Sequence, residues 1–311
     1  MKAAAGRGGM FTLKQLEALI WVVRLGGFAP AAYHLRTTQS AISKRVGELE
    51  ERLGTQLFDR TARSAHLTEK GRELFLLGEG LMEHHHQIVE QVSRADVMTR
   101  DLRIGITELT ALTWLPQLVD EISRAYPKVS IEQEIATSVS LFDGLAEDKF
   151  DVIFAADIPD RRQLFKREPI GSVENIWMCS PHVIRTFVPR TSTDLARFNI
   201  LVQGERSGTW VQYENWLREH HIDRRQIRYC SDLIAQIGFT LSGLGVSYLP
   251  LQALDYLVSS GRLAILDIPP KLSPVTYVAV ERIDRNSVLN RRVVQMAKRC
   301  CNFSKFALDV S

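Results

Sequence analysis

The sequence lacks the features typical of membrane proteins, secreted proteins and several classes of enzyme. No apolar run approaches the roughly 18 residues that a membrane-spanning helix needs. The N-terminal stretch MKAAAGRGGM contains basic residues but no apolar segment follows it, which excludes a secretion signal. No G-x-S-x-G, phosphate-loop or histidine/acid metal motif occurs. We therefore expect no catalytic residue, no metal, no cofactor and no membrane partner.

Cysteine is scarce as well. The four cysteines lack metal-ligand spacing, and four thiols in 311 residues do not form a disulfide framework. We expect reduced thiols, as in a cytoplasmic protein. The alternative is a redox switch between Cys179 and Cys230, although thiols in apolar, strand-like surroundings such as theirs tend to be inert.

Basic residues are unevenly distributed, although the net charge is only +3. Residues 10–72 hold ten lysines and arginines against six acids, which leaves residues 73–311 mildly acidic. This asymmetry suggests that a polyanion binds the first part alone. The length of 311 residues predicts two or three domains, and 45% hydrophobic with 24% charged residues is typical of a soluble globular protein. Residues 1–9 are rich in glycine and alanine, and we expect a disordered extension with Met10 as an alternative start.

Residues 11–53 predict three helices with a tight turn between the second and the third. Apolar residues recur at helical spacing from Phe11 to Leu25, with Thr12 as the N-cap. Small residues from Pro30 to Leu35 suit a short, closely packed helix. A third helix follows from Thr38 to Leu53, and its apolar residues share one face. This order predicts a helix-turn-helix.

The opposite face of the third helix is polar and basic over its N-terminal half. Gln39 can make two hydrogen bonds to adenine, and Lys44 and Arg45 can reach guanine or phosphate. A helix of this kind is suited to the major groove of DNA, whereas the alternative is an ordinary solvated helix face. The predicted DNA contacts are Pro30, Thr38, Gln39, Ser40, Ser43, Lys44, Arg45 and Arg63.

The next segment predicts a small hairpin, the wing of a winged helix. Apolar residues near position 58 and at Leu67 flank a polar turn at residues 61–65. Arg63 at the tip is placed to contact phosphate. Arg60 either does the same or pairs with an acid and holds the wing.

Residues from Thr68 to Val97 predict one long helix with a coiled-coil seam. The seam residues follow 3-4 spacing and are Leu74, Leu77, Leu81, His84, Ile88, Val92 and Ala95. Three consecutive histidines, His84 to His86, lie on this helix. Successive side chains on a helix point about 100° apart, so these three cannot converge on one metal ion.

Strands and helices alternate after the long helix. Strands are predicted at residues 102–106, 129–135 and 150–155, and a second α/β unit begins near residue 176. Such alternation predicts right-handed crossovers and a mostly parallel sheet. A final amphipathic helix is predicted from Ser287 to Phe303.

The chain resembles the LysR-type transcriptional regulators. Matching positions run without a gap from Phe11 to Gly71: Gly27-Phe28, Ala31-Ala32, Leu35, Thr38 to Lys44, Leu49-Glu50, Leu53-Gly54, Leu57 to Arg60 and Leu67 to Gly71. Looser matches continue through LRIG near 103, YPKVSIE near 128, FDVIF near 152 and SGLGVSYLP near 246. Ser40 stands where the family often has proline, and Pro30 where it often has a basic or polar residue. A particular operator sequence is therefore not carried over.

This resemblance implies a winged helix-turn-helix, a linker helix through which two chains dimerise, and a two-lobed α/β effector domain similar to periplasmic binding proteins. The expected bounds are 1–9 for the extension, 10–67 for the DNA-binding domain, 68–97 for the linker helix, and 101–311 for the effector domain, with lobe I at about 101–170 plus 271–311 and lobe II at about 171–270. The implied function is that of a sequence-specific, cytoplasmic regulator that binds an interrupted dyad in double-stranded DNA as a homotetramer. RNA polymerase is left open as a further partner.

The family's small-molecule effector binds between the lobes, where strand ends and helix N-termini supply polar groups. The predicted contacts are Thr107, Thr110 and Ser138 in lobe I and Gly204, Arg206 and Ser207 in lobe II. Ser138 matches a family position that often contacts effector. Leu109 stands where the family often has serine or threonine, so we expect Arg206 to supply a cation instead.

Other functions stay open at this point. The C-terminal half is in one alternative a ligand-free assembly module. In another, the chain is an enzyme or a solute-binding protein with an accessory basic domain. A redox-responsive regulator is a further alternative.

Overall fold

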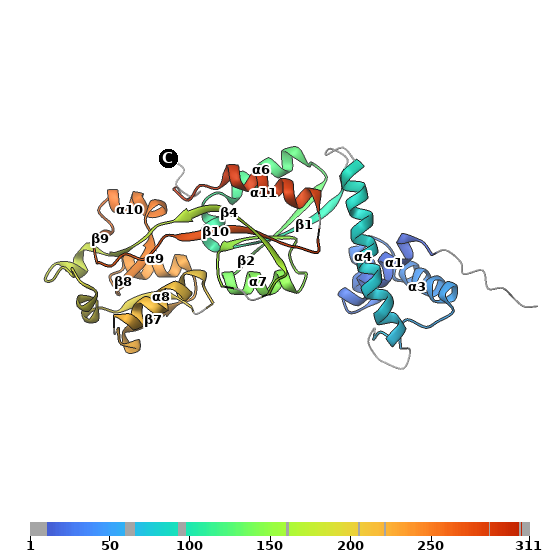
Figure 1. Cartoon of the computed structure of the whole chain (residues 1–311), viewed down its shortest axis with the longest axis horizontal. Coiled ribbons are helices and arrows are strands. Elements are labelled where there is room, and N and C mark those ends of the chain that lie inside the picture. The colour runs from blue at the N-terminus through green and yellow to red at the C-terminus, as the bar shows by residue number, and fades with distance from the viewer. Residues whose placement is uncertain are drawn as a thin grey trace, which may run out of the picture. The chain divides into compact units, whose positions relative to one another are not determined.

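The computed structural model describes residues 11–59, 66–92, 98–159, 162–204, 206–220, 222–285, 287–304 and 306. The chain divides into two compact units, Met1–Val92 and Ser93–Ser311 (Figure 1). Within the described residues no single helix is long and apolar enough to cross a membrane, and one bent pair, Leu13–Arg24 with Phe28–His34, meets the length and composition criteria only jointly.

The helices of the first unit are α1 (Leu13–Arg24), α2 (Phe28–His34), α3 (Gln39–Leu53) and α4 (Glu69–Val92). Thr12 begins α1 as predicted: its hydroxyl accepts from the N–H of Gln15 at 3.3 Å, and the Gln15 side chain accepts from the N–H of Thr12 at 2.9 Å. Thr38 caps α3 by accepting from the N–H of Ala41 at 3.2 Å. Gly54 ends α3 in the left-handed conformation, with φ of 65°.

A buried carboxylate joins the end of α3 to the wing. Glu50, 8% exposed, accepts hydrogen bonds from the N–H groups of Leu57 at 2.7 Å and Phe58 at 3.3 Å. Phe58 then pairs with Leu67 in an antiparallel bridge, as the predicted hairpin requires. Arg60 and Arg63 lie outside the described residues.

The linker helix α4 begins as predicted, with the Thr68 hydroxyl accepting from the N–H of Gly71 at 3.0 Å. Leu74 was predicted in the dimer seam, but it is half-buried against the core of its own unit. Helix α4 packs on α1, so part of the Leu74 side chain is already covered within its own unit, and its place in the seam stays a prediction. Apolar side chains farther along α4 are exposed: Leu77, Leu81, Ile88 and Val92. Ala95 lies outside the described residues.

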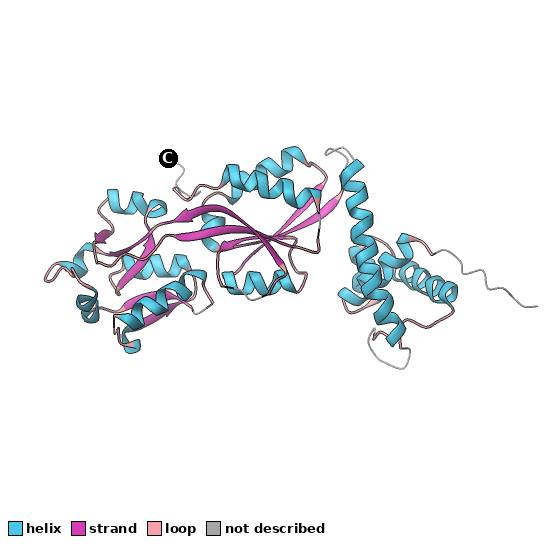
Figure 2. Cartoon of the chain, in the orientation of Figure 1, coloured by secondary structure: helices cyan, strands magenta, loops and turns pink. Residues whose placement is uncertain are grey.

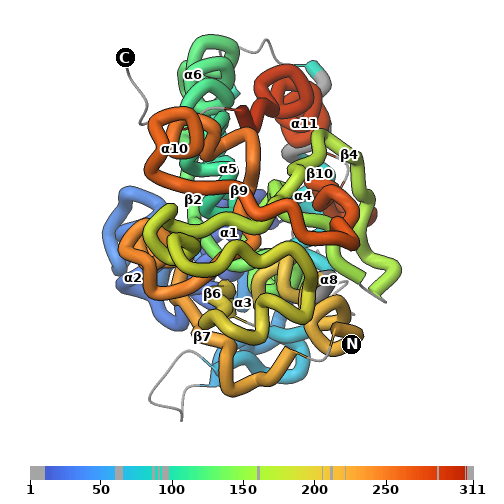
Figure 3. Tube along the Cα trace, turned by 90° about the vertical axis from the view of Figure 1, so that its left-hand side faces the viewer, coloured from blue at the N-terminus to red at the C-terminus, as the bar shows by residue number. Residues whose placement is uncertain are grey.

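The first sheet of the second unit lies in lobe I. Its strands are β1 (Arg100–Ile106), β2 (Val129–Ile135), β3 (Val152–Ala156), β4 (Phe165–Val173) and β10 (Val275–Arg282), in the order β2-β1-β3-β10-β4. The helices around it are α5 (Glu108–Leu112), α6 (Leu115–Ala125), α7 (Ser138–Ala146) and α11 (Val288–Cys300). Helices α6 and α11 lie side by side, in both Figures 1 and 3.

The second sheet lies in lobe II. Its strands are β5 (Asn175–Cys179), β6 (Ile200–Gln203), β7 (Ile227–Cys230), β8 (Val246–Pro250) and β9 (Ala264–Leu266), in the order β7-β6-β8-β5-β9. The α-helices are α8 (Gly208–Glu219), α9 (Leu233–Leu241) and α10 (Asp255–Ser259). Short 3₁₀ helices are η2 (Pro181–Ile184), η3 (Ser192–Arg197), η4 (Arg224–Gln226) and η5 (Gln252–Leu254).

Two crossings of the chain join the lobes (Figure 2). Strand β4 passes into β5 through Glu174, and residues 267–274 lead back from β9 into β10. Because β10 runs antiparallel to β3 and β4, and β5 runs antiparallel to β8 and β9, each sheet is mixed. The predicted parallel arrangement is confirmed for the βαβ units, and in each sheet only one strand, β10 or β5, runs against the other four.

Candidate nucleic-acid interface and lobe junction

The face of α3 opposite its core exposes the side chains that the sequence predicted. Ile42, Val46 and Leu49 are buried against α1 and α2. Gln39, Ser40, Ser43 and Lys44 are exposed, and Arg45 is half-buried. The Thr38 hydroxyl lies 3.0 Å from the Ser40 hydroxyl in addition to capping the helix. These groups therefore form one continuous polar surface at the N-terminal half of α3.

The exposed surface continues onto α2, and it includes one residue that was not among the predicted DNA contacts. Pro30 is exposed in the first turn of α2, and Tyr33, one turn later, is 90% exposed. Within the described part of the chain the Tyr33 hydroxyl has no hydrogen-bond partner. The signal was a lone aromatic residue next to the small residues Ala31 and Ala32, which turn inward.

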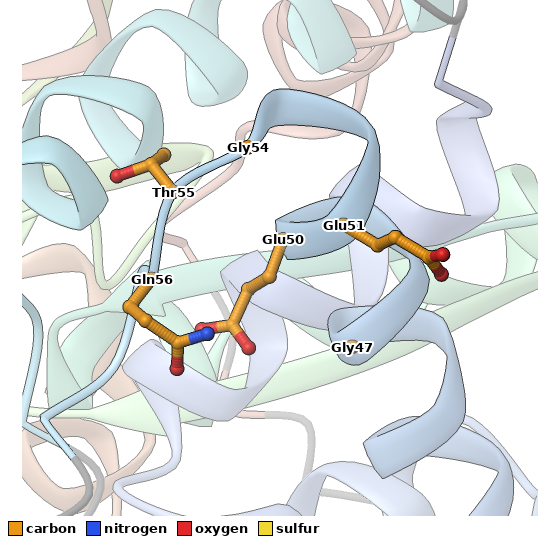
Figure 4. A pocket seen from close by; sticks show the side chains of 6 residues that line it. All are labelled: Gly47, Glu50, Glu51, Gly54, Thr55 and Gln56. Carbon is orange, nitrogen blue, oxygen red and sulfur yellow. The ribbon is translucent and has the colours of Figure 1, made fainter.

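The C-terminal half of α3 differs from its N-terminal half. A hollow of about 350 Å³ opens between Gly47, Glu51 and Gln56 (Figure 4). No atom lies within 4 Å of the point that a Cβ on Gly47 would occupy. Two carboxylates, those of Glu48 and Glu51, also stand on this half, and negative charge repels phosphate. The exposed Arg52 in the last turn therefore stands beside these acids, whereas the first two turns of α3 carry Lys44 and Arg45 with no acid.

In lobe I, Thr107 and Thr110 bond to each other instead of facing an open site. Their hydroxyls are 3.1 Å apart and both residues are buried. The buried Tyr277 lies against this pair: burial raises the pKa of Tyr277 to about 12, in spite of the lowering effect of its hydrogen bond with Thr107. The three hydroxyl groups form an internal polar cluster.

Ser138, Arg206 and Ser207 are brought together where the N-termini of α7 and α8 meet. The backbone carbonyl of Arg206 accepts from the N–H of Val139 at 3.2 Å. A Cβ on Gly208 would lie 2.5 Å from the Cβ of Ala156 and 2.7 Å from the Ser138 hydroxyl, so the lobes touch directly. Ser138 is consequently only 2% exposed.

The side chain of Arg206 also reaches across to lobe I. Its Nη2 lies 2.7 Å from an oxygen of Asp143, and its Nε lies 3.2 Å from the Ser140 hydroxyl. Ser207 caps α8 by accepting from the N–H of Trp210 at 3.2 Å. Gly204 accepts from the N–H of Ser207 at 2.9 Å. The predicted effector residues thus lie at the junction of the lobes, where several of them already bond to protein groups.

Sequence reasoning missed two further groups at the junction. Asp143 is the partner of Arg206, and Glu108 in lobe I accepts two backbone N–H groups from α9 in lobe II. Neither residue belongs to a recognisable motif, because each finds its partner only when the lobes come together. Gly208 could have been suspected as a site of close approach.

The thiols do not favour a redox switch. Cys179 on β5 and Cys230 on β7 are separated by β8 and β6, so three strand spacings of about 4.8 Å, roughly 14 Å in total, lie between them. Burial raises the pKa of Cys179 to about 11, and burial also raises the pKa of Cys230, so both stay protonated at neutral pH.

Two family models match this architecture. Residues 13–72 match the model described as "Bacterial regulatory helix-turn-helix protein, lysR family", and residues 95–301 match the "LysR substrate binding domain". The chain belongs to the LysR family. It is a DNA-binding transcriptional regulator with a substrate-binding domain, and it is not an enzyme. LysR-type regulators bind DNA and are oligomeric.

Relatives of this LysR-type chain cover most of its length. It is 25% identical over 272 residues to the HTH-type transcriptional regulator SoxR of an Arthrobacter species, covering 88% of this chain and 91% of the relative. It is 25% identical over 282 residues to BbuR of Bordetella bronchiseptica, covering 90% of this chain and 86% of the relative. Among solved structures, a full-length OxyR cysteine variant from Pseudomonas aeruginosa matches with a TM-score of 0.66 at 20% identity, covering 95% and 97% of the two chains. Full-length CbnR complexed with its target DNA matches with a TM-score of 0.52 at 19% identity, covering 94% and 100%. These structures share the fold.

Proposed function

We propose that this regulator reads its operator with the N-terminal half of α3 and the exposed face of α2. The observation that supports this proposal is the single surface formed by Gln39, Ser40, Ser43 and Lys44 on a helix that buries Ile42, Val46 and Leu49 on its other side. Gln39 would specify adenine, and Lys44 and Arg45 would contact guanine or phosphate. Thr38 and Pro30 would set the approach to the backbone, and Arg63 would add a phosphate contact from the wing.

The exposed apolar residues of α4 support dimerisation through this helix. Leu77 is 67% exposed and Val92 is 79% exposed, and a helix in water does not ordinarily present a line of such side chains. Two copies of α4 would bury them in a coiled coil and place two recognition helices on an interrupted dyad. Pairing of effector domains would extend the dimer to a tetramer in the cytoplasm, where chromosomal DNA and RNA polymerase are available.

A small anionic effector is the ligand class that the junction favours. The N-termini of α7 and α8 meet there, and helix N-termini attract negative charge. In the first turns that the structure describes, neither helix carries an acid, and Arg206 stands beside them. Binding would require the contact between Gly208 and Ser138 to open, and it would shift the two lobes relative to each other.

The DNA-binding proposal is tested by footprinting full-length protein on the DNA next to its own gene. We expect protection of two half-sites spaced by about one helical turn, or a multiple of it, on one face of the duplex. Leu81→Lys combined with Ile88→Lys places charges in the proposed seam and should abolish protection of the paired sites. Equal protection by this variant and by the unchanged protein would contradict dimerisation through α4.

The effector proposal is tested by thermal unfolding of full-length protein with a panel of small carboxylates and phosphates, matched with neutral analogues of the same size. A ligand at about 100 times its Kd should add about 2.7 kcal/mol of stability. No stabilisation by any anion would favour the alternative in which residues 101–311 only assemble the protein. Two observations favour this alternative: Ser138 is buried, and the Arg206 side chain already binds Asp143.

A further inference from the structure

The N-terminus of α9 is capped by groups from both lobes. Within lobe II, Asp232 accepts from the N–H of Ala235 at 2.7 Å, as an ordinary N-cap does. From lobe I, the Glu108 carboxylate accepts from the N–H of Leu233 at 2.5 Å and from the N–H of Ile234 at 3.2 Å. Three successive N–H groups of the first turn of α9 therefore point at carboxylates.

The Glu108 bonds cross the junction between the lobes. Glu108 begins α5, directly after β1 of lobe I, and it is separated by 125 residues from Leu233. Hydrogen bonds from backbone N–H groups to a carboxylate are charge-assisted and are strengthened by the helix dipole. The neighbouring side chains Leu109 and Leu233 are both buried in one apolar cluster that contains residues of both lobes. The contact between the lobes at this place thus has two parts: the hydrogen bonds of Glu108 and, beside them, the packing of Leu109 and Leu233.

The other junction, between α7 and α8, has a different character. There the lobes meet through a backbone hydrogen bond from Val139 to Arg206, through the close approach of the Gly208 backbone, and through the solvent-exposed ion pair of Arg206 with Asp143. Both junctions bring a helix N-terminus of lobe II against lobe I. At the α5–α9 junction the first turn of α5 carries an acid, Glu108, whereas the first turns of α7 and α8 carry none. The N-terminus of α9, which attracts negative charge, is thereby occupied by a carboxylate of the protein itself.

We propose that Glu108 acts as a latch: its carboxylate, attached to lobe I, binds the N-terminus of α9 in lobe II and holds the two lobes together in the free protein. It occupies the N-terminus of α9 as the carboxylate of a bound molecule would, so closure of the lobes needs no ligand. This inference goes beyond effector sensing and does not depend on it, because it concerns the protein alone.

Hydrogen exchange of the full-length protein, followed by mass spectrometry, tests the latch. In Glu108→Ala, the amides of the first turn of α9 should exchange about tenfold faster. The amide of Val139 should also exchange about fivefold faster, because its acceptor lies in the other lobe. Asp232→Ala removes a cap of the same helix without touching the junction, and it should affect α9 alone. Faster exchange restricted to α9 in both variants, or no change in Glu108→Ala, would overturn the proposal and leave Glu108 as a helix cap.

Chemical rescue gives a second measurement. Acetate should fit the space left in Glu108→Ala and restore slow exchange at both α9 and Val139, whereas chloride at equal ionic strength should not. Glu219→Ala, which removes an exposed acid at the far end of α8, should behave as the unchanged protein in both salts. Should Glu108→Ala lose its fold, the isosteric Glu108→Gln decides by the exchange of the first-turn amides of α9 and of the Val139 amide, while slow exchange in β3 and β6 reports that the second unit is intact. Failure of acetate to slow the Val139 amide would argue against a latch.

Discussion

The recognition face of α3 and the junction between the lobes contain similar polar residues in opposite surroundings. Ser40 and Ser43 are exposed on a helix whose partners lie behind it, whereas Ser138 and Ser207 are buried where two lobes meet. Lys44 is exposed on its helix, while Arg206 binds Asp143 across the junction. The first surface is exposed in the free protein, whereas the second would have to open before a molecule could reach Ser138.

This difference separates two kinds of mutational effect. We expect a substitution on the exposed face of α3 to change DNA affinity without changing the free energy of unfolding. A residue at the junction changes the free energy of unfolding first, because its present partners are protein groups. Variants at the two places should therefore differ in which measurement responds.

The largest effect is expected from Gln39→Ala combined with Arg45→Ala. Each good bidentate contact discriminates by about 1–3 kcal/mol, so the pair should weaken operator binding by about 100-fold or more. Unfolding should be almost unchanged, because Gln39 is exposed and Arg45 is half-buried. Fluorescence anisotropy with labelled operator at fixed salt measures the affinity. Lys128→Ala, which removes one exposed cation from the second unit, is the charge control and should bind as the unchanged protein does.

A smaller effect, on stability, is expected from Gly208→Ala. The new methyl would lie 2.5 Å from the Cβ of Ala156, so the lobes must separate, at a cost of roughly 1–3 kcal/mol. Thermal unfolding should show a Tm lower by several degrees. Gly238→Ala in α9 is the matched control, since nothing lies within 4 Å of its added Cβ, and it should gain about 0.5–1 kcal/mol. Equal Tm values for the two variants would show that the lobes do not press together at Gly208.

The comparison also explains what the sequence could predict. The helical spacing of Ile42, Val46 and Leu49 predicts both the buried face of α3 and, by exclusion, its exposed polar face, and the structure confirms both. That information is local in the sequence, whereas the role of the polar face in DNA binding stays a prediction. The states of Arg206 and Glu108 depend on Asp143 and on α9, which are distant in sequence and which no periodicity connects to them. The direction of β10 likewise follows from the return crossing, not from its own residues.

A further prediction concerns Tyr33, which only the structure identified. If its hydroxyl donates to a phosphate, Tyr33→Phe should weaken DNA binding about 3- to 10-fold, the equivalent of one hydrogen bond of about 0.5–1.5 kcal/mol. Tyr33→Ala should weaken it somewhat more, and neither should lower the Tm, because Tyr33 is 90% exposed. Tyr229→Phe, at a tyrosine of the second unit that is 51% exposed, serves as the control in the same binding assay. Unchanged affinity in both Tyr33 variants would limit the interface to α3 and the wing.

The smallest effect on stability is expected from Arg206→Ala. Its ion pair with Asp143 is 58% exposed on the arginine side, and such pairs contribute about 0.2–1 kcal/mol. The bond from Val139 uses the backbone carbonyl of Arg206, which alanine retains, and the contact at Gly208 is untouched. The Tm should therefore fall by little more than in Arg224→Ala, where the lost pair with Glu214 lies within lobe II. A fall as large as that of Gly208→Ala would mean that the side chain of Arg206, and not the backbone beside it, holds this junction closed. The arginine would then have to leave Asp143 before it could bind an effector. The affinity of the junction for anions would consequently be lower than the 58% exposure of the Arg206 side chain suggests.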